Sequence, residues 1–432
     1  MARSRQRPSF SVPADYSSLN NNVRSESDLI YDWNRLDGPE LTFRRPPMLD
    51  DETLRDGLQS PSVLDPSIEK KLRILHLMED LGIDSVDLGL PGAGPRARQD
   101  VLQLAQEIAT AKLRIKPNCA ARTADSDIRP IADIVQATGV PIEAATFIGS
   151  SPIRQYAEDW TLDFLLRTTE RAVKFTVRLG LACMYVTEDT TRARPEVIKK
   201  LYTTAIECGA KAIVVCDTVG HATPRGVHAL LRFVRDEVVE PTGEKVRLDW
   251  HGHSDRGLAV ANSLAAYEAG ADQVHGTALG IGERVGNTPM DQMLVNLKLM
   301  GAIDRDLTKL RDYGRTVSEA VGVPIPPNYP VLGSDAFRTA TGVHAAAVIK
   351  AFRKDDAALA NQVYSGVPSH WFGLEQEIEI GPMSGKSNVI YWLERRGINP
   401  TEELVNRIFS RAKQADRLLT EAEIQEICRE RQ

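Results

Sequence analysis

The feature that most constrains the fold of this chain is a regular alternation of short apolar segments with amphipathic helical segments, which begins near Pro47. The apolar segments predict eight strands, at residues 48–53, 85–90, 115–121, 142–148, 182–187, 212–216, 246–250 and 273–277. Helical patterns lie between them, as at residues 67–81, 99–112, 161–179, 195–208, 224–237 and 258–269. Alternating strands and helices indicate a parallel sheet, and eight such units indicate an α/β fold closed into a (β/α)8 TIM barrel.

Prolines and glycines lie at the boundaries of the predicted helices. Pro66, Pro195 and Pro224 lie near predicted helix starts, where the missing N–H is tolerated. Glycines end the helices that lead into strands, at Gly82, Gly139, Gly180, Gly209 and Gly270. The competing fold is an open doubly wound sheet, which would carry a phosphate-binding glycine fingerprint after its first strand. Residues 53–57 read Thr-Leu-Arg-Asp-Gly and do not match one.

Length and composition are those of a globular protein with a large core: 432 residues, 42% hydrophobic and 26% charged. We expect a barrel at residues 46–300 and a smaller, mostly helical linker and lid or dimerisation subdomain at 301–432. A net charge of −6 without a basic cluster argues against nucleic-acid binding. No apolar run approaches membrane-spanning length. The five cysteines never form CxxC, which favours reduced thiols in the cytoplasm.

Residues 1–45 differ from the rest of the chain and are expected to form a flexible N-terminal extension. Residues 1–22 are rich in Arg, Ser and Asn and have no apolar core of a secretory signal. A flexible tail is favoured over a transit peptide, and residues 25–33 form a candidate short helix that packs on a partner subunit.

Polar residues recur after the predicted strands, and in a barrel these positions share one rim, where active sites form. They are Arg55, Asp56 and Gln59; Arg122; Ser150 and Ser151; Glu188 and Asp189; Asp217 and Thr218; His251 and His253; and residues 280–287. Because side chains alternate along a strand, His251 and His253 point to one side and suit a divalent cation. The alternative interpretation of such a pair is hydrogen-bonded loop histidines.

The chain resembles the DRE-TIM metallolyase superfamily, in particular its Claisen-condensing branch of 2-isopropylmalate and homocitrate synthases. The resemblance covers about residues 48–397. The matching segments are residues 54–61 (LRDGLQSP), 216–220 (CDTVG), 251–253 (HGH), 258–263 (LAVANS), 282–287 (GERVGN) and 384–388 (SGKSN).

The resemblance implies a metal-dependent acyltransferase that condenses acetyl-CoA with a 2-oxo acid. Asp56, His251 and His253 are then expected to bind a divalent cation (Mg²⁺, Mn²⁺, Zn²⁺ or Co²⁺), with Asn287 as an outlying fourth ligand. Such a set leaves positions open for a chelating 2-oxo acid. Arg55 is expected to direct positive charge at the keto oxygen. The substrate contacts expected at the rim are Gln59, Arg122, Ser151 and Thr218.

The base that takes a proton from the acetyl group is expected in the C-terminal region. By resemblance, His344 and Tyr364 reach the barrel of a neighbouring subunit, with Glu188 as the barrel carboxylate beside them. A histidine suits general-base work near neutral pH. This arrangement predicts a homodimer with shared sites.

Several departures from the family pattern leave the substrate open. Leu58 stands where many synthases have glutamate, Ala145 where isopropylmalate synthases have histidine, and Ser254 and Leu279 each replace asparagine. The leucine-sensing domain is not expected. Arg122 and Arg154 are candidates for holding a second anionic group, or are surface arginines. Pyruvate-like, branched-chain, dicarboxylic and phosphorus-containing 2-oxo acids all remain possible acceptors.

Three other functions compete. An HMG-CoA lyase shares the metal motif and leucine at position 58, but it would carry a catalytic cysteine in the loop after strand eight, which here reads Gly280-Ile281-Gly282-Glu283. A carboxyltransferase would need a modified lysine on a barrel strand, and none is suitable. An inactive paralogue that binds acyl-CoA is disfavoured by the intact Asp56, His251 and His253.

Overall fold

A computed structural model describes residues 29–35, 41–354 and 356–430. The predicted extension at residues 1–45 therefore lies largely outside the described residues, as does the start of the candidate helix at 25–33. The described part of that segment contains the 3-10 turn η1 (Trp33–Arg35). Residues 42–432 form a separate compact unit, which contains the barrel.

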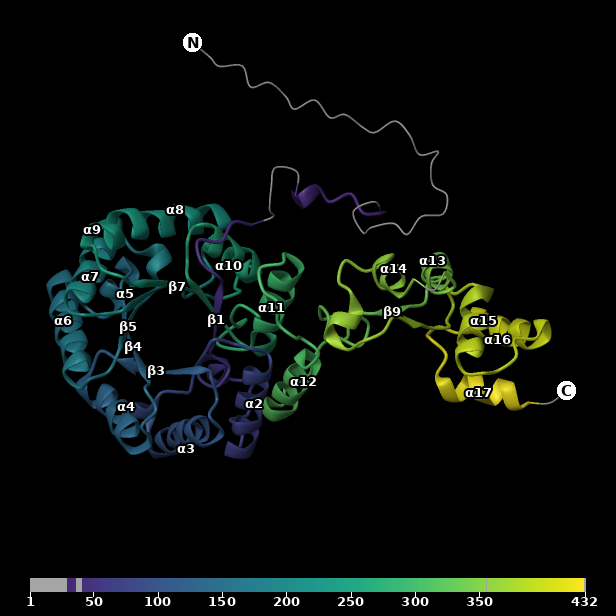
Figure 1. Ribbon diagram of the computed structural model, residues 1–432, viewed down its shortest axis with the longest axis horizontal. Coiled ribbons are helices and arrows are strands. Elements are labelled where there is room, and N and C mark those ends of the chain that lie inside the picture. The colour runs from purple at the N-terminus through teal and green to yellow at the C-terminus, as the bar shows by residue number, and fades with distance from the viewer. Residues whose placement is uncertain (1–28, 36–40, 355, 431–432) are drawn as a thin grey trace, which may run out of the picture. The chain divides into compact units, whose positions relative to one another are not determined.

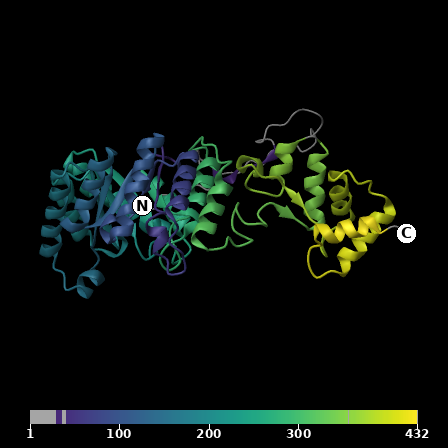
Figure 2. The ribbon, with the colours of Figure 1, turned by 90° about the horizontal axis from the view of Figure 1, so that it is seen from below.

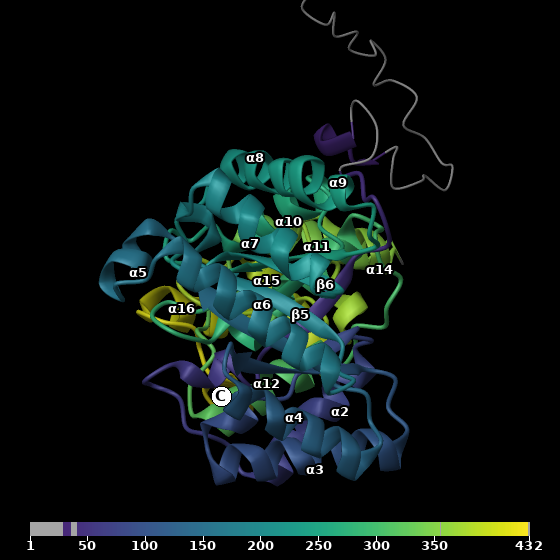
Figure 3. The same cartoon turned by 90° about the vertical axis from the view of Figure 1, so that its left-hand side faces the viewer.

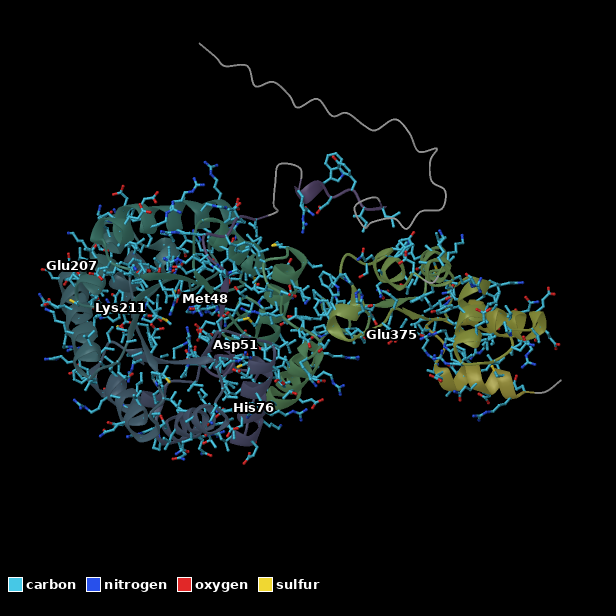
Figure 4. All side chains as sticks on the ribbon, in the orientation of Figure 1. Met48, Asp51, His76, Glu207, Lys211 and Glu375 are labelled. Atoms are coloured by element: carbon cyan, nitrogen blue, oxygen red, sulfur yellow. The ribbon has the colours of Figure 1, made fainter. Side chains whose placement is uncertain are left out.

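Eight parallel strands close into a barrel in chain order, with β8 beside β1, so the predicted fold is confirmed (Figure 1). The strands are β1 (Met48–Asp51), β2 (Ser85–Asp87), β3 (Lys116–Arg122), β4 (Glu143–Gly149), β5 (Cys183–Glu188), β6 (Ala212–Asp217), β7 (Arg247–Gly252) and β8 (Gln273–Gly276). Met48 and Asp51, labelled in Figure 4, belong to this ring, whereas His76 lies on an outer helix.

The helices run around the outside of the ring (Figures 1 and 3). They are α2 (Ile68–Asp80), α3 (Pro95–Ala111), α4 (Asp125–Thr138), α5 (Pro152–Ala157), α6 (Leu162–Arg178), α7 (Pro195–Glu207), α8 (Pro224–Val234), which continues as a π-helix (Arg235–Val239) into α9 (Glu240–Thr242), and α10 (Ala259–Glu268). The predicted stops at Gly82, Gly139, Gly180, Gly209 and Gly270 all have positive φ, as a left-handed helix end requires.

Helix α4 is one of the helices that the sequence pattern did not predict. Pro130 lies inside it, and an internal proline removes a hydrogen-bond donor. The helix forms because Ile128, Ile131 and Ile134 are buried on one face. None of the helices among the described residues is long and apolar enough to cross a membrane.

The interior of the barrel is unusual because charged groups fill a large part of it. Arg247 on β7 pairs with Glu143 at 2.8 Å and Asp249 at 2.9 Å, and Asn118 donates to Asp50 at 2.8 Å. His275 Nδ1 lies 2.6 Å from Glu52 Oε1. Buried charges persist when they are paired and hydrogen-bonded. This network pairs its charges, although Asp50 Oδ2 and His275 Nε2 have no hydrogen-bond partner among the described residues.

The chain after the barrel continues into helices that pack on its core. After η6 (Ala278–Gly280) come α11 (Met290–Leu299) and α12 (Leu310–Val321). Tyr313, Val317 and Val321 of α12 are fully buried in the main hydrophobic cluster. Val331, Phe337 and Phe372 belong to that cluster too.

The C-terminal region has its own small cores. It contains β9 (Arg338–Thr339), α13 (Gly342–Phe352), α14 (Ala357–Gln362), β10 (Glu377–Ile378), α15 (Lys386–Arg395), α16 (Glu402–Gln414) and α17 (Glu421–Arg429), drawn in green to yellow in Figure 2. One cluster joins α15, α16 and α17 around Trp392 and Ile408, and a second joins α13 to β10 around Val348 and Ile378.

Asp51 links β1 to α12 through buried hydrogen bonds. Its carboxylate accepts from the backbone N–H of Thr53 at 2.8 Å and from the Tyr313 hydroxyl. Burial raises the pKa of Asp51 from 3.8 to about 7, against the lowering effect of these hydrogen bonds. The folded protein therefore holds the Asp51 proton at pH values where the unfolded chain has lost it.

We expect Asp51→Asn to remove a pH dependence of stability. As pH rises from 4 to 7, unfolding releases the Asp51 proton, so the wild type loses about 1.4 kcal/mol of unfolding free energy per pH unit through this group. The free energy of unfolding of the variant minus that of the wild type, measured with urea, should therefore rise between pH 4 and pH 7 and level off above pH 7. Asp80→Asn, an exposed carboxylate on α2, is the control and should give a flat difference. A flat difference for Asp51→Asn would contradict the assignment.

Candidate active site

Arg55 organises the carboxyl end of the barrel. It follows β1 and donates Nε to Asp87 at 2.7 Å, Nη1 to Asp56 at 3.0 Å and Nη2 to Glu52. Burial alone would lower the pKa of Arg55, but the three carboxylates outweigh it and raise the pKa well above its usual value. The guanidinium thus carries a fixed positive charge, and it lines the cavity inside the barrel.

His251 and His253 converge with Asp56, as the strand alternation predicts. His251 lies at the end of β7 and His253 directly after it. Their Nε2 atoms are 3.2 Å apart, and Asp56 Oδ2 lies 3.6 Å from that of His251 and 3.9 Å from that of His253. All three side chains are buried.

Asn287 lies against this cluster and supports it. It pairs with His253 through an isolated β-bridge, and its Nδ2 donates to Asp56 Oδ1 at 3.0 Å. Its Oδ1 is buried without a hydrogen-bond partner. A Cβ at Gly282 would lie 2.2 Å from Asn287 Nδ2 and 3.2 Å from Asp56 Oδ1, so the close approach of this loop requires glycine.

The donor set of Asp56, His251 and His253 fits a divalent cation. Neighbouring ligands of an ion with bonds of about 2.1 Å are about 3.0–3.4 Å apart, close to the separations found here. Two imidazole nitrogens and a carboxylate oxygen within this distance repel one another unless a cation or a proton lies between them. The pKa of His253 is lowered to about 4, mainly by burial and then by His251, which leaves a neutral nitrogen ligand at pH 7.

Glu52, His251 and His275 form a second group with metal-ligand spacing. Burial alone would lower the pKa of His275, but Asp50, Asp249 and Glu52 raise it well above the usual value. His275 Nδ1 lies 2.6 Å from Glu52 and its Nε2 lies 3.5 Å from Asp249, so carboxylates already face both ring nitrogens in an internal ion-pair network. Glu52 also lies 3.4 Å from Nδ1 of His251, where it orients that ring.

The cluster opens into a cavity of about 130 Å³ inside the barrel. Seven rim residues predicted from the sequence line it: Arg55, Asp56, Gln59, Glu188, Thr218, His251 and His253. Glu283, in the predicted rim segment 280–287, lines it too. The sequence analysis missed Glu52, Asp87 and His275, which also line the cavity. These three lie in or just after strands, so the alternation of side chains along each strand could have predicted that they point inward.

Two predicted contacts do not line this cavity. Arg122 bonds Asp127 at 2.6 and 3.0 Å and is largely exposed. Ser151 caps α5 by accepting from the N–H of Arg154 at 3.3 Å.

Glu188 does line the cavity, as predicted. Burial raises the pKa of the Glu188 carboxyl, and Arg154, 3.8 Å away, opposes that shift.

His344 and Tyr364 are brought together, with ring centroids 4.3 Å apart. Both are exposed, and neither lines the barrel cavity of its own chain. The segment 384–388 fixes the start of α13, which carries His344. Asn388 donates to the carbonyls of Ala340 and Glu379 at 3.1 and 2.9 Å, and the N–H of Gly342 donates to Met383 at 3.0 Å.

The structure thus has a closed (β/α)8 barrel with a cluster at its carboxyl end that can hold a divalent cation. A family model described as HMGL-like matches residues 47–317. The chain therefore belongs to the HMGL-like family.

Curated relatives match over most of the chain. A homocitrate synthase (AksA) of Methanopyrus kandleri is 34% identical over 88% of this chain and 91% of its own length. A 2-isopropylmalate synthase of a Geobacillus species is 33% identical over 84% of this chain and 69% of its own. An (R)-citramalate synthase of Methanocaldococcus jannaschii is 30% identical over 88% and 74%.

Solved structures support the fold. The HMG-CoA lyase of Bacillus subtilis superimposes with a TM-score of 0.55 and is 18% identical, covering 66% of this chain and 97% of that one. The lyase of Brucella melitensis gives a TM-score of 0.52 at 18% identity, with 63% and 97% coverage.

We expect His253→Ala to weaken divalent metal binding at least about tenfold, because one of few protein ligands is lost. The fold should survive, since the ring of strands does not depend on this rim residue. Metal content after dialysis and circular dichroism check both points. His228→Ala, a surface histidine 3.0 Å from Glu268, is the control. Wild-type metal content in His253→Ala would contradict the ligand assignment.

Proposed function

We propose that this protein condenses acetyl-CoA with a 2-oxo acid, giving a 2-hydroxy dicarboxylate and free CoA. The observation that carries the proposal is the cluster of Asp56, His251 and His253 beside Arg55 in the cavity at the carboxyl end of the barrel. Relatives named homocitrate, 2-isopropylmalate and citramalate synthase support the same reaction class.

In the proposed reaction, a base removes a proton from the acetyl methyl group. The resulting carbanion forms a carbon–carbon bond to the keto carbon, whose oxygen takes up a proton. Water then cleaves the thioester and releases CoA. Asp56, His251 and His253, with Asn287 beside them, would hold a divalent cation, which when bound supplies Lewis-acid polarisation of the keto group.

Arg55 is suited to stabilise the charge that develops on the keto oxygen. Its positive charge is fixed by three carboxylates, so no reorganisation is needed at the moment of reaction. Glu52, whose Oε1 lies 3.4 Å from Nδ1 of His251, orients the imidazole ring of His251. Gln59 and Thr218 are the proposed substrate contacts among the predicted residues that line the cavity. Arg122 and Ser151 remain proposed substrate contacts, but they would have to bind a part of the substrate that lies outside this cavity.

We propose His344 as the general base, with the Tyr364 ring beside it at an interplanar angle of 31° and Glu188 as its partner in the barrel. His344 and Tyr364 do not line the cavity of their own chain, and Val343 and Met383 beside them are 75% and 70% exposed. These exposed apolar side chains support docking on a second copy of the chain. We therefore propose a homodimer in which residues 301–432 act as the lid and dimerisation subdomain.

A lyase reaction with a catalytic cysteine receives less support. The loop after β8 has no cysteine, and Cys216, which lines the cavity, has a thiol pKa raised well above its usual value by burial. Such a thiol is a poor nucleophile at neutral pH. The described cysteines are all free, which supports the proposed cytoplasmic location.

We expect release of CoA from acetyl-CoA only when a 2-oxo acid and a divalent cation are both present. The thiol is followed with a chromogenic reagent, and chelation followed by dialysis should abolish the rate. Adding Mg²⁺, Mn²⁺, Zn²⁺ or Co²⁺ separately should restore it for at least one ion. A rate that persists after metal removal, and does not change on metal addition, would disprove the proposed reaction.

We expect two inactive variants, His344→Ala and Asp56→Ala, to complement each other when mixed. In a heterodimer one site combines an intact barrel with an intact lid, so random exchange should restore about a quarter of the wild-type sites. Subunit exchange is verified with differently tagged chains. If verified heterodimers stay inactive, each site is built within one chain.

A further inference from the structure

The cavity has two chemically different sides. Its apolar side comes from four consecutive strands, β3 to β6, and consists of Ala120, Ala145, Phe147, Met184, Val186, Val214 and Cys216. We call these residues the apolar wall. The other side comes from β1, β2, β7, β8 and the loops after them, and it carries Arg55, Asp56 and the two histidines. Strands β3, β5 and β6 also bring one polar lining residue each, at or near their ends: Asn118, Glu188 and Thr218.

The apolar wall is packed and has little hydrogen-bonding capacity. Ala145, Met184, Val214 and Cys216 form one buried cluster, with Val186 against it. The only side-chain polar atom on the wall is the Cys216 sulfur, whose closest partner is the Val214 carbonyl at 3.9 Å. A charged substrate group placed here would lose its hydration without gaining a partner.

The charge around the cavity leads to the same conclusion. Among the described residues that line it, five are carboxylates: Glu52, Asp56, Asp87, Glu188 and Glu283. The fixed guanidinium of Arg55 is already shared by three of them. His275 is held by Glu52 at 2.6 Å, so it is not available to a substrate.

Arg122 and Arg154, the two candidates for binding a second anionic group of the substrate, already pair with carboxylates of the protein. Arg122 bonds Asp127, and Arg154 lies 3.1 Å from Glu158 and 3.8 Å from Glu188. Neither lines the cavity.

We propose that the acceptor is a 2-oxo monocarboxylic acid with a short, uncharged alkyl group, and that this group lies against the apolar wall. The inference rests on the proposed condensation and specifies its substrate class. The single carboxylate belongs on the polar side, where Arg55 and the metal ligands lie. A second carboxylate, as in 2-oxoglutarate or oxaloacetate, would face the apolar wall or the carboxylates that line the cavity.

The test is a panel of acceptors assayed with acetyl-CoA and metal: pyruvate, 2-oxobutyrate, 3-methyl-2-oxobutanoate, 2-oxoglutarate and oxaloacetate. We expect the best alkyl acid to exceed either dicarboxylic acid by about 100-fold or more in kcat/KM, because a buried site discriminates strongly against an unpaired polar group. A thermal shift with each acid and metal, without acetyl-CoA, should give the same ranking. A preferred dicarboxylic acid would overturn the inference alone, whereas no CoA release with any acid would overturn the proposed reaction.

Variants of the apolar wall localise the alkyl group. Val186→Thr keeps the side-chain volume but adds a hydroxyl, and should lower kcat/KM for the best alkyl acid about tenfold through KM. Its KM for acetyl-CoA should not change. Val177→Thr, on the exposed surface of α6, is the matched control.

Ala145→Val provides an independent measurement. It adds two methyl groups to the apolar wall and should reduce kcat/KM more for the largest accepted alkyl group than for the smallest. Wild-type selectivity in both Val186→Thr and Ala145→Val would mean that the alkyl group does not lie on this wall.

Discussion

The ion pairs that Arg55 makes with Glu52, Asp56 and Asp87 are the interaction on which the site depends. They join the loop after β1 to β2 and hold Asp56 toward His251 and His253. Isolated buried carboxylates would take up protons or move to solvent. Against the effect of burial, Arg55 lowers the pKa of Glu52 and Asp56, so these two remain charged inside the barrel and can orient a histidine, a cation or a substrate. Burial outweighs the same ion pair at Asp87 and raises its pKa to about 7.

This concentration of charge divides the barrel interior. Strands β1, β2, β7 and β8 carry most of the charged network down to Asp50 and Asp249, and Glu143 at the start of β4 joins it through Arg247. The remainder of β4, with β5 and β6, contributes the apolar cluster around Met184. A barrel filled by branched apolar residues throughout would leave no such contrast. The division provides a polar side for the reacting groups and an apolar side for the remainder of a small substrate.

The sequence predicted the eight strands because each apolar run is bounded by loops, and five of the runs follow a glycine at the end of a helix. It also predicted that Arg55, Asp56, His251 and His253 meet, since strand ends share one rim. Glu52 and His275 were missed because a charged residue within a barrel strand contradicts the usual apolar filling. Arg122 lies at a strand end too, but Asp127 on α4 draws its guanidinium outward. The contact of His344 with Tyr364 depends on the packing of the C-terminal region and has no local sequence pattern.

Binding of one cation by Asp56, His251 and His253 can be measured by anomalous diffraction from crystals of the protein loaded with Mn²⁺ or Zn²⁺. We expect a single strong anomalous peak between Asp56 Oδ2 and the Nε2 atoms of His251 and His253, at about 2.0–2.2 Å from each. A peak between Glu52, His251 and His275, or no peak in this cluster at full metal content, would contradict this ligand assignment.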